Sequence, residues 1–310
     1  MGIIKNILSL KDAENKNSMN SDMMYELSNK EIKVLQDILL DMYKEINNIC
    51  KNYNIETLLV GGSALGAIRH KGFIPWDDDL DIAMNRKDYK KFINIFRETL
   101  GDRYILRAPN SYDIANNRFI QVFKKGTELS VISSDKETMP NMVHLDIFPI
   151  DYAPENKLLR IIKGTYCNIL MIIASAVDIH MNKSKRLKKL LYQTFSGKTT
   201  YFIWDTVGWL FSFYKLNKWY DVLDNAIQTN KKTRYCTIAV GRKHYFGELL
   251  PYDVFYPLKK SNFENIEINL PNNAHEYLKN LYDDYMVIPQ TNKREKHYIV
   301  SFKYNDEFRK

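Results

Sequence analysis

The chain has 310 residues, enough for one large domain or two moderate ones, and 45% hydrophobic and 26% charged residues argue against disorder beyond the first two dozen residues. Its net charge of +8 favours an anionic partner such as nucleotide phosphates, nucleic acid or a membrane surface. Cys50, Cys167 and Cys236 lie far apart without a CxxC spacing, which argues against a disulfide framework or a zinc site. Reduced thiols in a cytoplasmic protein are the simplest interpretation.

The first half of the chain alternates between predicted helices and strands. After a polar leader over 1–28, Ser28 and Glu31 form a capping-box pattern, and apolar residues at helical spacing predict a helix to about Tyr53. TLLVGG predicts a buried strand that ends in a tight turn, SALGAIR a short helix, LDIAM a second strand and RKDYKKFINIFRETL an amphipathic helix. Further strands are expected at 104–108, 119–125, 128–133 and 143–150.

The pattern changes after about residue 155. Helices are expected at 158–179 and 183–195, and residues 199–223 are apolar and aromatic with few helix breakers. Strands are expected at 235–240, 253–258 and 263–270, and a closing helix at 273–286. We therefore predict an α/β (α+β) fold, with a mixed-sheet core over 29–155 and a helical and mixed C-terminal region over 156–310.

One apolar segment raises the question of a membrane. Residues 161–179 are nearly long enough to cross a bilayer, but Lys163, Asn168 and Asp178 interrupt them, so a spanning helix is not expected. The surrounding residues 157–198 contain nine basic side chains against one acidic side chain. An apolar helix beside such a basic block is typical of a peripheral contact with an anionic membrane, and a core helix followed by a solvated basic helix is the alternative.

The stretch WDDDLDIAM places Asp77, Asp78, Asp79 and Asp81 within five positions. On an extended chain Asp79 and Asp81 project from the same face, while the residues between and after them point into the core. Two carboxylates side by side suit Mg²⁺, which takes oxygen ligands and shares them with substrate phosphates. A solvated acidic turn is the alternative.

A phosphate-binding pattern precedes these aspartates. Gly61, Gly62 and Ser63 lie at a strand-to-helix junction, where backbone N–H groups and the helix N-terminus favour an anion. The Ser63 hydroxyl could donate to the same anion, and Arg69 and Lys71 follow on the connecting loop. A phosphate cradle, cations and paired carboxylates in this order favour metal-assisted phosphoryl transfer.

Two further candidates lie farther along the chain. Asp146 in VHLDIFPID is a single acid in an apolar strand, where burial without a partner would be costly. We expect it on an adjacent strand, facing Asp79 and Asp81 across the metal, and pairing with a nearby Lys or Arg is the alternative. His297, together with Arg294, is a candidate contact for donor phosphate, although a late basic cluster is more often a solvated face.

The segment GGSALGAIRHKGFIPWDDDLDIAMNRKDYKKF closely resembles the signature of the LicD family of phosphotransferases, whose core has the nucleotidyltransferase fold. The resemblance continues through HLDIFPID and, more loosely, GELLPYDVFYPL and HEYLKNLYDDYM, and covers most of 58–150 and parts of 246–298. Two positions depart from the family pattern. Gln121 stands where relatives often have a lysine, and Asp284 stands where a glycine-containing turn is commoner.

The resemblance implies Mg²⁺-dependent, or Mn²⁺-dependent, transfer of a phospho-alcohol from a CDP-linked donor to a sugar hydroxyl of a cell-surface glycan, with release of CMP. Phosphocholine from CDP-choline is the best-known case, and the acceptor would be a teichoic acid, a capsule or a lipopolysaccharide, in some cases lipid-linked. By this similarity Asp79, Asp81 and Asp146 would bind the metal, while Gly62 and Ser63 would contact the donor diphosphate.

Other roles and functions stay open. Asp77, Asp78 and Asp146 are candidates for the general base, with Asp77 preferred. The alternative functions are a polyol-phosphate transferase that uses a CDP-alditol, a small-molecule nucleotidyltransferase and a non-catalytic glycan-binding module. No RNA-recognition motif is found and the basic excess lacks interleaved aromatic residues, so no nucleic-acid partner is expected. We expect a cytoplasmic protein, at the inner face of the membrane if the basic segment binds lipid.

Overall fold

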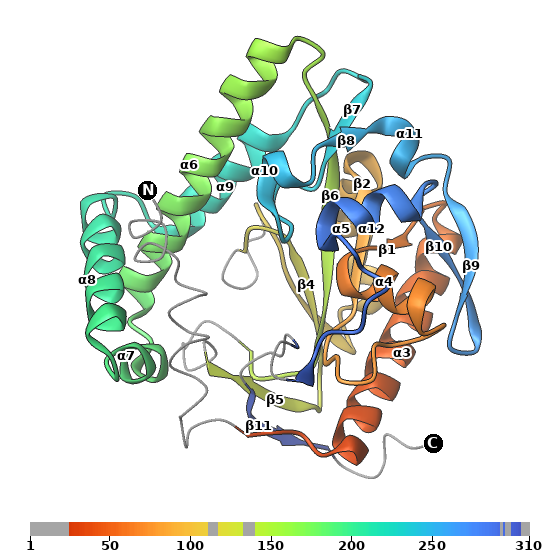
Figure 1. The fold of residues 1–310 in the computed structure, drawn as a ribbon, viewed down its shortest axis with the longest axis horizontal. Coiled ribbons are helices and arrows are strands. Elements are labelled where there is room, and N and C mark those ends of the chain that lie inside the picture. The colour runs from red at the N-terminus through yellow and green to blue at the C-terminus, as the bar shows by residue number, and fades with distance from the viewer. Residues whose placement is uncertain (1–24, 111–116, 133–139, 292–293, 295–298, 305–310) are drawn as a thin grey trace.

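The computed structural model describes residues 25–110, 117–132, 140–291, 294 and 299–304. It has the mixed α/β fold that the sequence predicts (Figure 1). The helices in chain order are α3 (Asn29–Asn52), α4 (Gly61–Arg69), α5 (Arg86–Leu100), α6 (Lys157–Asn182), α7 (Lys185–Leu191), α8 (Phe195–Leu210), α9 (Leu216–Ile227), α10 (His244–Gly247), α11 (Tyr252–Phe255) and α12 (Ala274–Tyr282).

The strands form one large sheet and two small ones. They are β1 (Leu58–Leu59), β2 (Asp81–Asn85), β3 (Tyr104–Arg107), β4 (Ile120–Lys124), β5 (Glu128–Val131), β6 (His144–Ala153), β7 (Tyr235–Thr237), β8 (Leu250–Pro251), β9 (Lys259–Phe263), β10 (Ile266–Leu270) and β11 (Ile299–Lys303). The large sheet runs β1-β2-β6-β4-β3, with β7 and β8 added to the far end of β6. Within it β2 and β6 pair in parallel, and the other neighbours pair antiparallel.

Two buried clusters account for most of the core. The larger one joins α3, α4, α5 and the large sheet to α12 and β9–β11, so residues from both ends of the described chain share it. The second lies between α6, α9 and the end of β6, with Leu170, Val177 and Leu223 among its buried members. In Figure 1, α3, α4 and α12 accordingly lie on one side of the central sheet and α6–α9 on the other.

Local signals place most of the elements where the sequence predicts them. Ser28 caps α3 through a complete capping box with Glu31, and α5 has the predicted bounds. Two strand predictions are wrong. Residues 253–258 are not a strand, because α11 and a cis Tyr256–Pro257 bond occupy them. Residues 263–270 are not one strand, because β9 ends at Phe263 and β10, which pairs with it antiparallel, begins at Ile266. In the turn after α12, Asp283 has a positive φ of +56°.

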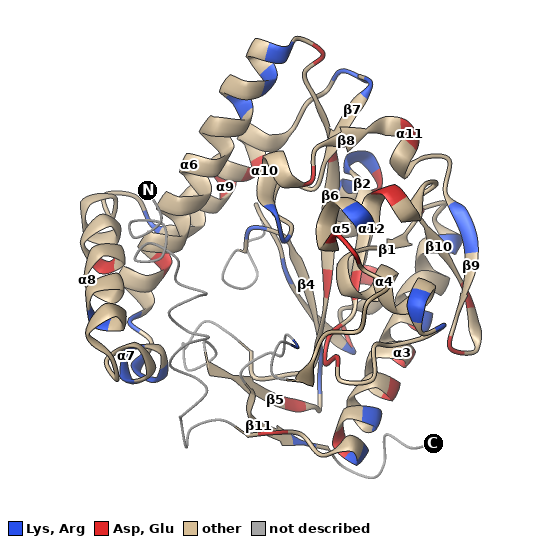
Figure 2. Ribbon diagram, in the orientation of Figure 1, with Lys and Arg blue, Asp and Glu red and all other residues tan. Residues whose placement is uncertain are grey.

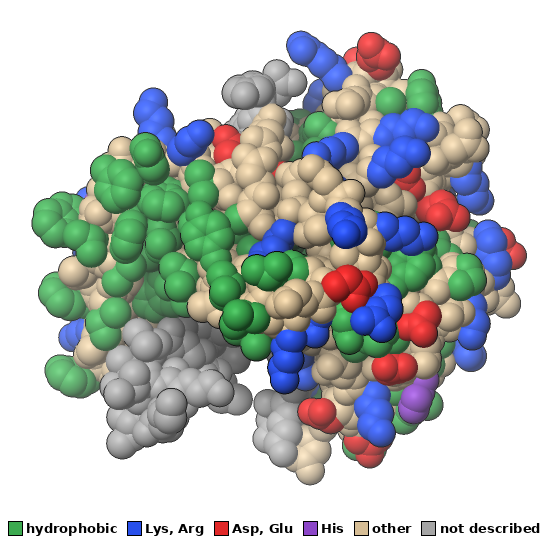
Figure 3. Space-filling model, turned by 90° about the horizontal axis from the view of Figure 1, so that it is seen from above, with side chains coloured by type: hydrophobic (Ala, Val, Ile, Leu, Met, Phe, Trp, Pro, Cys, Tyr) green, Lys and Arg blue, Asp and Glu red, His purple; other side chains and the backbone are tan. Residues whose placement is uncertain are grey.

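The helix α6 is the one in the described chain that is long and apolar enough to cross a membrane by length and composition. Only 28% of its most apolar window is buried. Apolar side chains gather on the face seen in Figure 3, over the half of the molecule that α6 and α8 occupy. Lysine and arginine side chains lie at the N-terminal end of α6 and on α7 (Figure 2).

Candidate active site

Two of the predicted carboxylates lie side by side at the centre of the large sheet. Asp81 opens β2, and its register partner on the parallel strand β6 is Asp146. Paired residues of neighbouring strands project from the same face of a sheet, so both carboxylates lie on one face. Leu80 and Ile82 are fully buried on the opposite side, as the predicted alternation requires. The structure thus places Asp146 on the strand next to Asp81, as expected.

The other three aspartates form a separate group just before β2. Asp77, Asp78 and Asp79 each offer a carboxylate oxygen, and these oxygens lie within 4.8 Å of one another. All three side chains are partly exposed, so water or a ligand can reach them. The oxygens are therefore close enough to share one hard cation, and this trio differs from the predicted set of Asp79, Asp81 and Asp146.

Both groups lie against the N-terminus of α4. A Cβ atom added to Gly61 would come 3.0 Å from Asp81 Oδ2, and one added to Gly62 would come 3.1 Å from Asp77 Oδ2. Gly61 also has a φ of +54°, which other residues rarely adopt. The two glycines therefore let carboxylates approach the helix end, where the helix dipole favours negative charge.

Ser63 has a structural contact in addition to its predicted role. Its hydroxyl accepts a hydrogen bond of 2.8 Å from the backbone N–H of Asp81, and its side chain is 3% exposed. The bond ties the start of β2 to the first turn of α4. It therefore fixes the distance between the carboxylate pair and the helix N-terminus.

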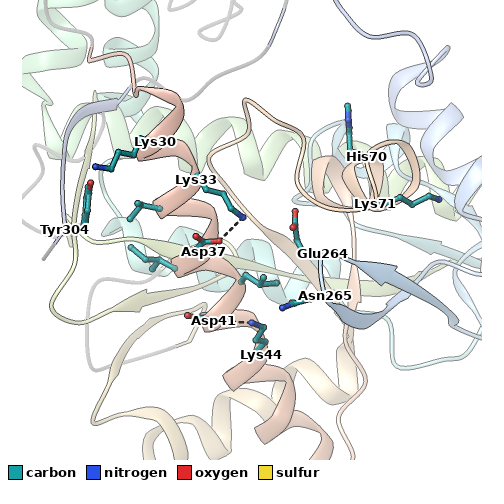
Figure 4. A pocket seen from close by; sticks show the side chains of 13 residues that line it. Lys30, Lys33, Asp37, Asp41, Lys44, His70, Lys71, Glu264, Asn265 and Tyr304 are labelled. Atoms are coloured by element: carbon teal, nitrogen blue, oxygen red, sulfur yellow. Dashed lines mark hydrogen bonds and ion pairs between the residues drawn. The ribbon is translucent and has the colours of Figure 1, made fainter. Parts of the chain in front are cut away.

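The predicted cations occupy different surroundings. Arg69 Nη1 donates to the carbonyl oxygen of Tyr285 at 2.7 Å, so the guanidinium anchors the segment after α12. Burial lowers the pKa of Arg69, and the charge of Asp77 opposes this shift. Lys71 lines a hollow of about 820 Å³ between α3 and the β9–β10 turn. In Figure 4 its side chain extends away from the ion pair of Lys33 and Asp37. His297 lies outside the described residues.

Asp146 is held by polar neighbours on β4 and β6. Gln121 Nε2 donates to Asp146 Oδ1 at 3.1 Å, and Arg107 Nη1 donates to Gln121 Oε1 at 3.3 Å. His144 Nε2 lies 3.7 Å from the same carboxylate oxygen. Gln121 thus takes a place beside the carboxylate where the family pattern would put a lysine, and it orients Asp146 without adding a charge.

The C-terminal part of the chain contributes residues that the sequence did not single out. Burial raises the pKa of Tyr282, Arg242 lowers it, and Asp81, Asp77 and Asp79 add to the rise, so this phenol lies within electrostatic reach of both carboxylate groups. Its neighbour Tyr277 accepts a hydrogen bond of 3.1 Å from the N–H of Gly61. Both tyrosines come from HEYLKNLYDDYM, which gave only a loose resemblance.

Trp76 directly precedes the acidic trio, where its ring could stack on a ligand or pack against the protein. The guanidinium of Arg294 lies 3.9 Å from the centre of its ring, and the ring packs against the larger core. Arg294, named beside His297 in the late basic cluster, therefore lies next to the acidic group. This contact favours the packing interpretation for the face that Arg294 covers.

The donor set fits a hard divalent cation. Asp81 and Asp77 approach the N-terminus of α4, with Asp146 beside Asp81 and with Asp78 and Asp79 beside Asp77. The three cysteines, Cys50, Cys167 and Cys236, are buried in the core. Carboxylate oxygens are the ligands that Mg²⁺ and Mn²⁺ prefer, and a neighbouring helix N-terminus suits a phosphate.

Comparisons with known proteins agree with this arrangement. Residues 54–166 match the family described as LicD/FKTN/FKRP, nucleotidyltransferase domain. The chain is 26% identical over 273 residues to the lipopolysaccharide cholinephosphotransferase LicD of Haemophilus influenzae, an alignment that covers 85% of this chain and 94% of that protein. It is also 29% identical over 145 residues to an uncharacterized protein of Rickettsia typhi, which covers 47% of this chain and 43% of that protein. The chain therefore contains a LicD-type nucleotidyltransferase domain over residues 54–166, and it is similar to the LicD protein of Haemophilus influenzae over most of its length.

Proposed function

We propose that this protein transfers a phospho-alcohol, phosphocholine in the first instance, from a CDP-linked donor to a sugar hydroxyl of a cell-surface glycan, in a Mg²⁺-dependent reaction in the cytoplasm. The observation that carries the proposal is the pairing of Asp81 with Asp146 beside the N-terminus of α4, inside a LicD-family domain. The similarity to a lipopolysaccharide cholinephosphotransferase over most of the chain supports the choice of head group and of a glycan acceptor.

In this proposal the predicted metal ligands are Asp79, Asp81 and Asp146. A bound Mg²⁺ would neutralise negative charge on the donor diphosphate as the phosphorus is attacked. The α4 N-terminus, with Gly62 at its first turn, would orient the diphosphate through backbone N–H groups.

The acceptor hydroxyl needs a base within hydrogen-bond reach. Asp77 is the preferred candidate, because its carboxylate lies against Gly62 and so next to the place proposed for the diphosphate. The hydroxyl would attack the phosphorus that carries the alcohol, its proton would pass to Asp77, and the bond to CMP would break.

A binding experiment tests the donor. Thermal stability is measured with Mg²⁺ and CDP-choline, CDP-ethanolamine, CDP-glycerol or CDP-ribitol in turn. A ligand at 100 times its Kd stabilises the folded state by about 2.7 kcal/mol. We expect CDP-choline to stabilise most. Stabilisation by a CDP-alditol alone would instead assign a polyol-phosphate transferase, and release of pyrophosphate from a nucleoside triphosphate would assign a nucleotidyltransferase.

Substitutions then decide which carboxylates hold the metal. Asp81→Asn and Asp146→Asn should abolish Mg²⁺ binding in calorimetry and abolish CMP release, with little change in unfolding. Asp102→Asn, an exposed carboxylate in the turn after α5, is the matched control. If Asp78→Asn abolishes Mg²⁺ binding while Asp81→Asn and Asp146→Asn retain it, the metal is held by the trio before β2 and the proposed ligand set is wrong.

A further inference from the structure

The helix α6 is apolar on two opposite sides. Its inner side, with Leu170 and Val177, packs into the second buried cluster. Its outer side carries Leu158, Ile162 and Ile169 at helical spacing, and these side chains are 66%, 56% and 49% exposed. A helix that is apolar all round is normally enclosed by protein or by lipid. An outer side with this many exposed apolar side chains is therefore unusual for a helix that contacts only water.

The neighbouring helix α8 repeats the pattern. Phe195, Phe202 and Trp209 follow one another at seven-residue spacing and are 87%, 69% and 65% exposed. The two helices pack closely, since a Cβ added to Gly208 would come 2.2 Å from the carbonyl oxygen of Ala176. We use the term apolar face for the exposed side chains Leu158, Ile162, Ile169, Phe195, Phe202 and Trp209. Figure 3 shows apolar side chains gathered over the half of the molecule that α6 and α8 occupy.

Basic residues border the apolar face. Residues 157–198 contain nine lysines and arginines against one acidic residue, Asp178. Seven of them lie at the N-terminal end of α6 and on α7 (Figure 2), and Lys185 and Lys189 of α7 are exposed. Apolar side chains flanked by cations match the two layers of an anionic bilayer surface, acyl chains below and phosphate head groups above.

We propose that the apolar face seats the protein on the surface of an anionic lipid bilayer, with α6 and α8 lying along the membrane. A spanning α6 is disfavoured because its inner side would have to leave the second buried cluster. It would also break the two hydrogen bonds of 2.6 Å that Lys163 Nζ donates to the carbonyl of Gln228 and the hydroxyl of Thr229. A second copy of the chain is a poorer occupant, because a symmetric dimer through this face would bring the two basic borders together.

Vesicle sedimentation tests the proposal without any activity measurement. We expect the full chain to bind vesicles of phosphatidylcholine mixed with phosphatidylglycerol, and to bind phosphatidylcholine vesicles much more weakly. Each lysine near an anionic surface contributes about fivefold in affinity, so Lys185→Glu with Lys189→Glu should weaken binding at least about 25-fold. The control is Lys87→Glu with Lys90→Glu, two exposed lysines on α5, which should bind like the wild type.

The apolar side chains are tested by Phe202→Ser with Trp209→Ser. This variant should keep its unfolding temperature, because both side chains are exposed, and should lose vesicle binding. The control is Tyr53→Ser, an exposed aromatic residue at the end of α3. The proposal is overturned if the wild type does not bind anionic vesicles. It is also overturned if the double lysine variant and the double aromatic variant both bind these vesicles as tightly as the wild type does. It is also overturned if the wild type is a dimer that Phe202→Ser with Trp209→Ser converts to a monomer, since a second copy then covers the face.

Discussion

Replacing Arg86 with methionine should be among the most destabilising single changes in this fold. The guanidinium binds Asp151 through two hydrogen bonds, of 2.6 and 2.8 Å, and Asp224 through a third of 2.7 Å. The side chains of the two aspartates are 0% and 7% exposed, and that of Arg86 is 13% exposed. Burial lowers the pKa of Arg86, but the two carboxylates outweigh it, so the net pKa is raised.

The expected cost follows from what the substitution leaves behind. Arg86→Met removes the cation and leaves two buried carboxylates without their positively charged partner. Breaking a buried ion pair in this way lowers the free energy of unfolding by about 3–5 kcal/mol. Folded domains are stable by only about 5–15 kcal/mol, so the loss should be plain in urea unfolding followed by circular dichroism. The difference in stability between Arg86→Met and the wild type should be smaller at low pH, because a buried carboxylate that has lost its cation can then take up a proton.

The ion pair of Lys33 and Asp37 on α3 is the matched control. Its atoms are 2.8 Å apart, but the two side chains are 58% and 56% exposed. Water screens such a pair, so Lys33→Met should cost less than about 1 kcal/mol. Equal costs for Arg86→Met and Lys33→Met would refute the reasoning that burial, rather than distance, sets the contribution of the Arg86 network.

Two further predictions concern groups near the candidate active site. Burial raises the pKa of Glu248 from 4.5 to about 7. Between these two values the unfolded chain loses the Glu248 proton more readily than the folded protein does, so the free energy of unfolding falls as pH rises, by on the order of 3 kcal/mol in total. Glu248→Gln should therefore melt progressively higher relative to wild type between pH 5 and pH 8, and a constant difference would contradict the shift. Gly61→Ala should cost about 1–2 kcal/mol because of its positive φ, and it should also displace the Asp81 carboxylate and weaken Mg²⁺ binding. Gly62→Ala should displace the Asp77 carboxylate and slow CMP release without that cost in stability. Calorimetry of both variants checks this, and equal stability of the two would count against it.

Much of the catalytic half could be predicted because its signals are local. A capping box at Ser28 and a long amphipathic period over α5 each depend on residues a few positions apart. The pairing of Asp81 with Asp146 followed from one chemical argument, that an isolated acid in an apolar strand needs a partner. The family resemblance reinforced that argument on the same residues.

The predictions were wrong or incomplete where the structure of a segment depends on contacts with residues far away along the chain. The run from Asp253 to Leu258 is apolar and aromatic, a pattern that suits a short strand and a helical turn equally well. The strand β11 pairs with β5, about 170 positions away, and its own sequence gives no sign of that partner. Arg69 is a plausible phosphate ligand by position alone, until the chain after α12 folds back and offers it the Tyr285 carbonyl.

The acidic loop could be recognised from its own sequence, but the residues that hold its backbone in place could not, because they lie far away along the chain. Gln36 of α3 donates to the backbone carbonyls of Ile74 and Asp77, at 3.2 and 2.9 Å, and Glu264 of the β9–β10 turn accepts from the Phe73 N–H at 3.1 Å. A Cβ on Gly72 would come 2.1 Å from Oε1 of the same Glu264, so a larger residue there would displace this carboxylate from the Phe73 N–H. These contacts fix the backbone on which three neighbouring carboxylates are carried, and without them mutual repulsion would drive the aspartates apart. Hydrogen bonds to the backbone of the loop thus oppose the repulsion and hold the three aspartates side by side.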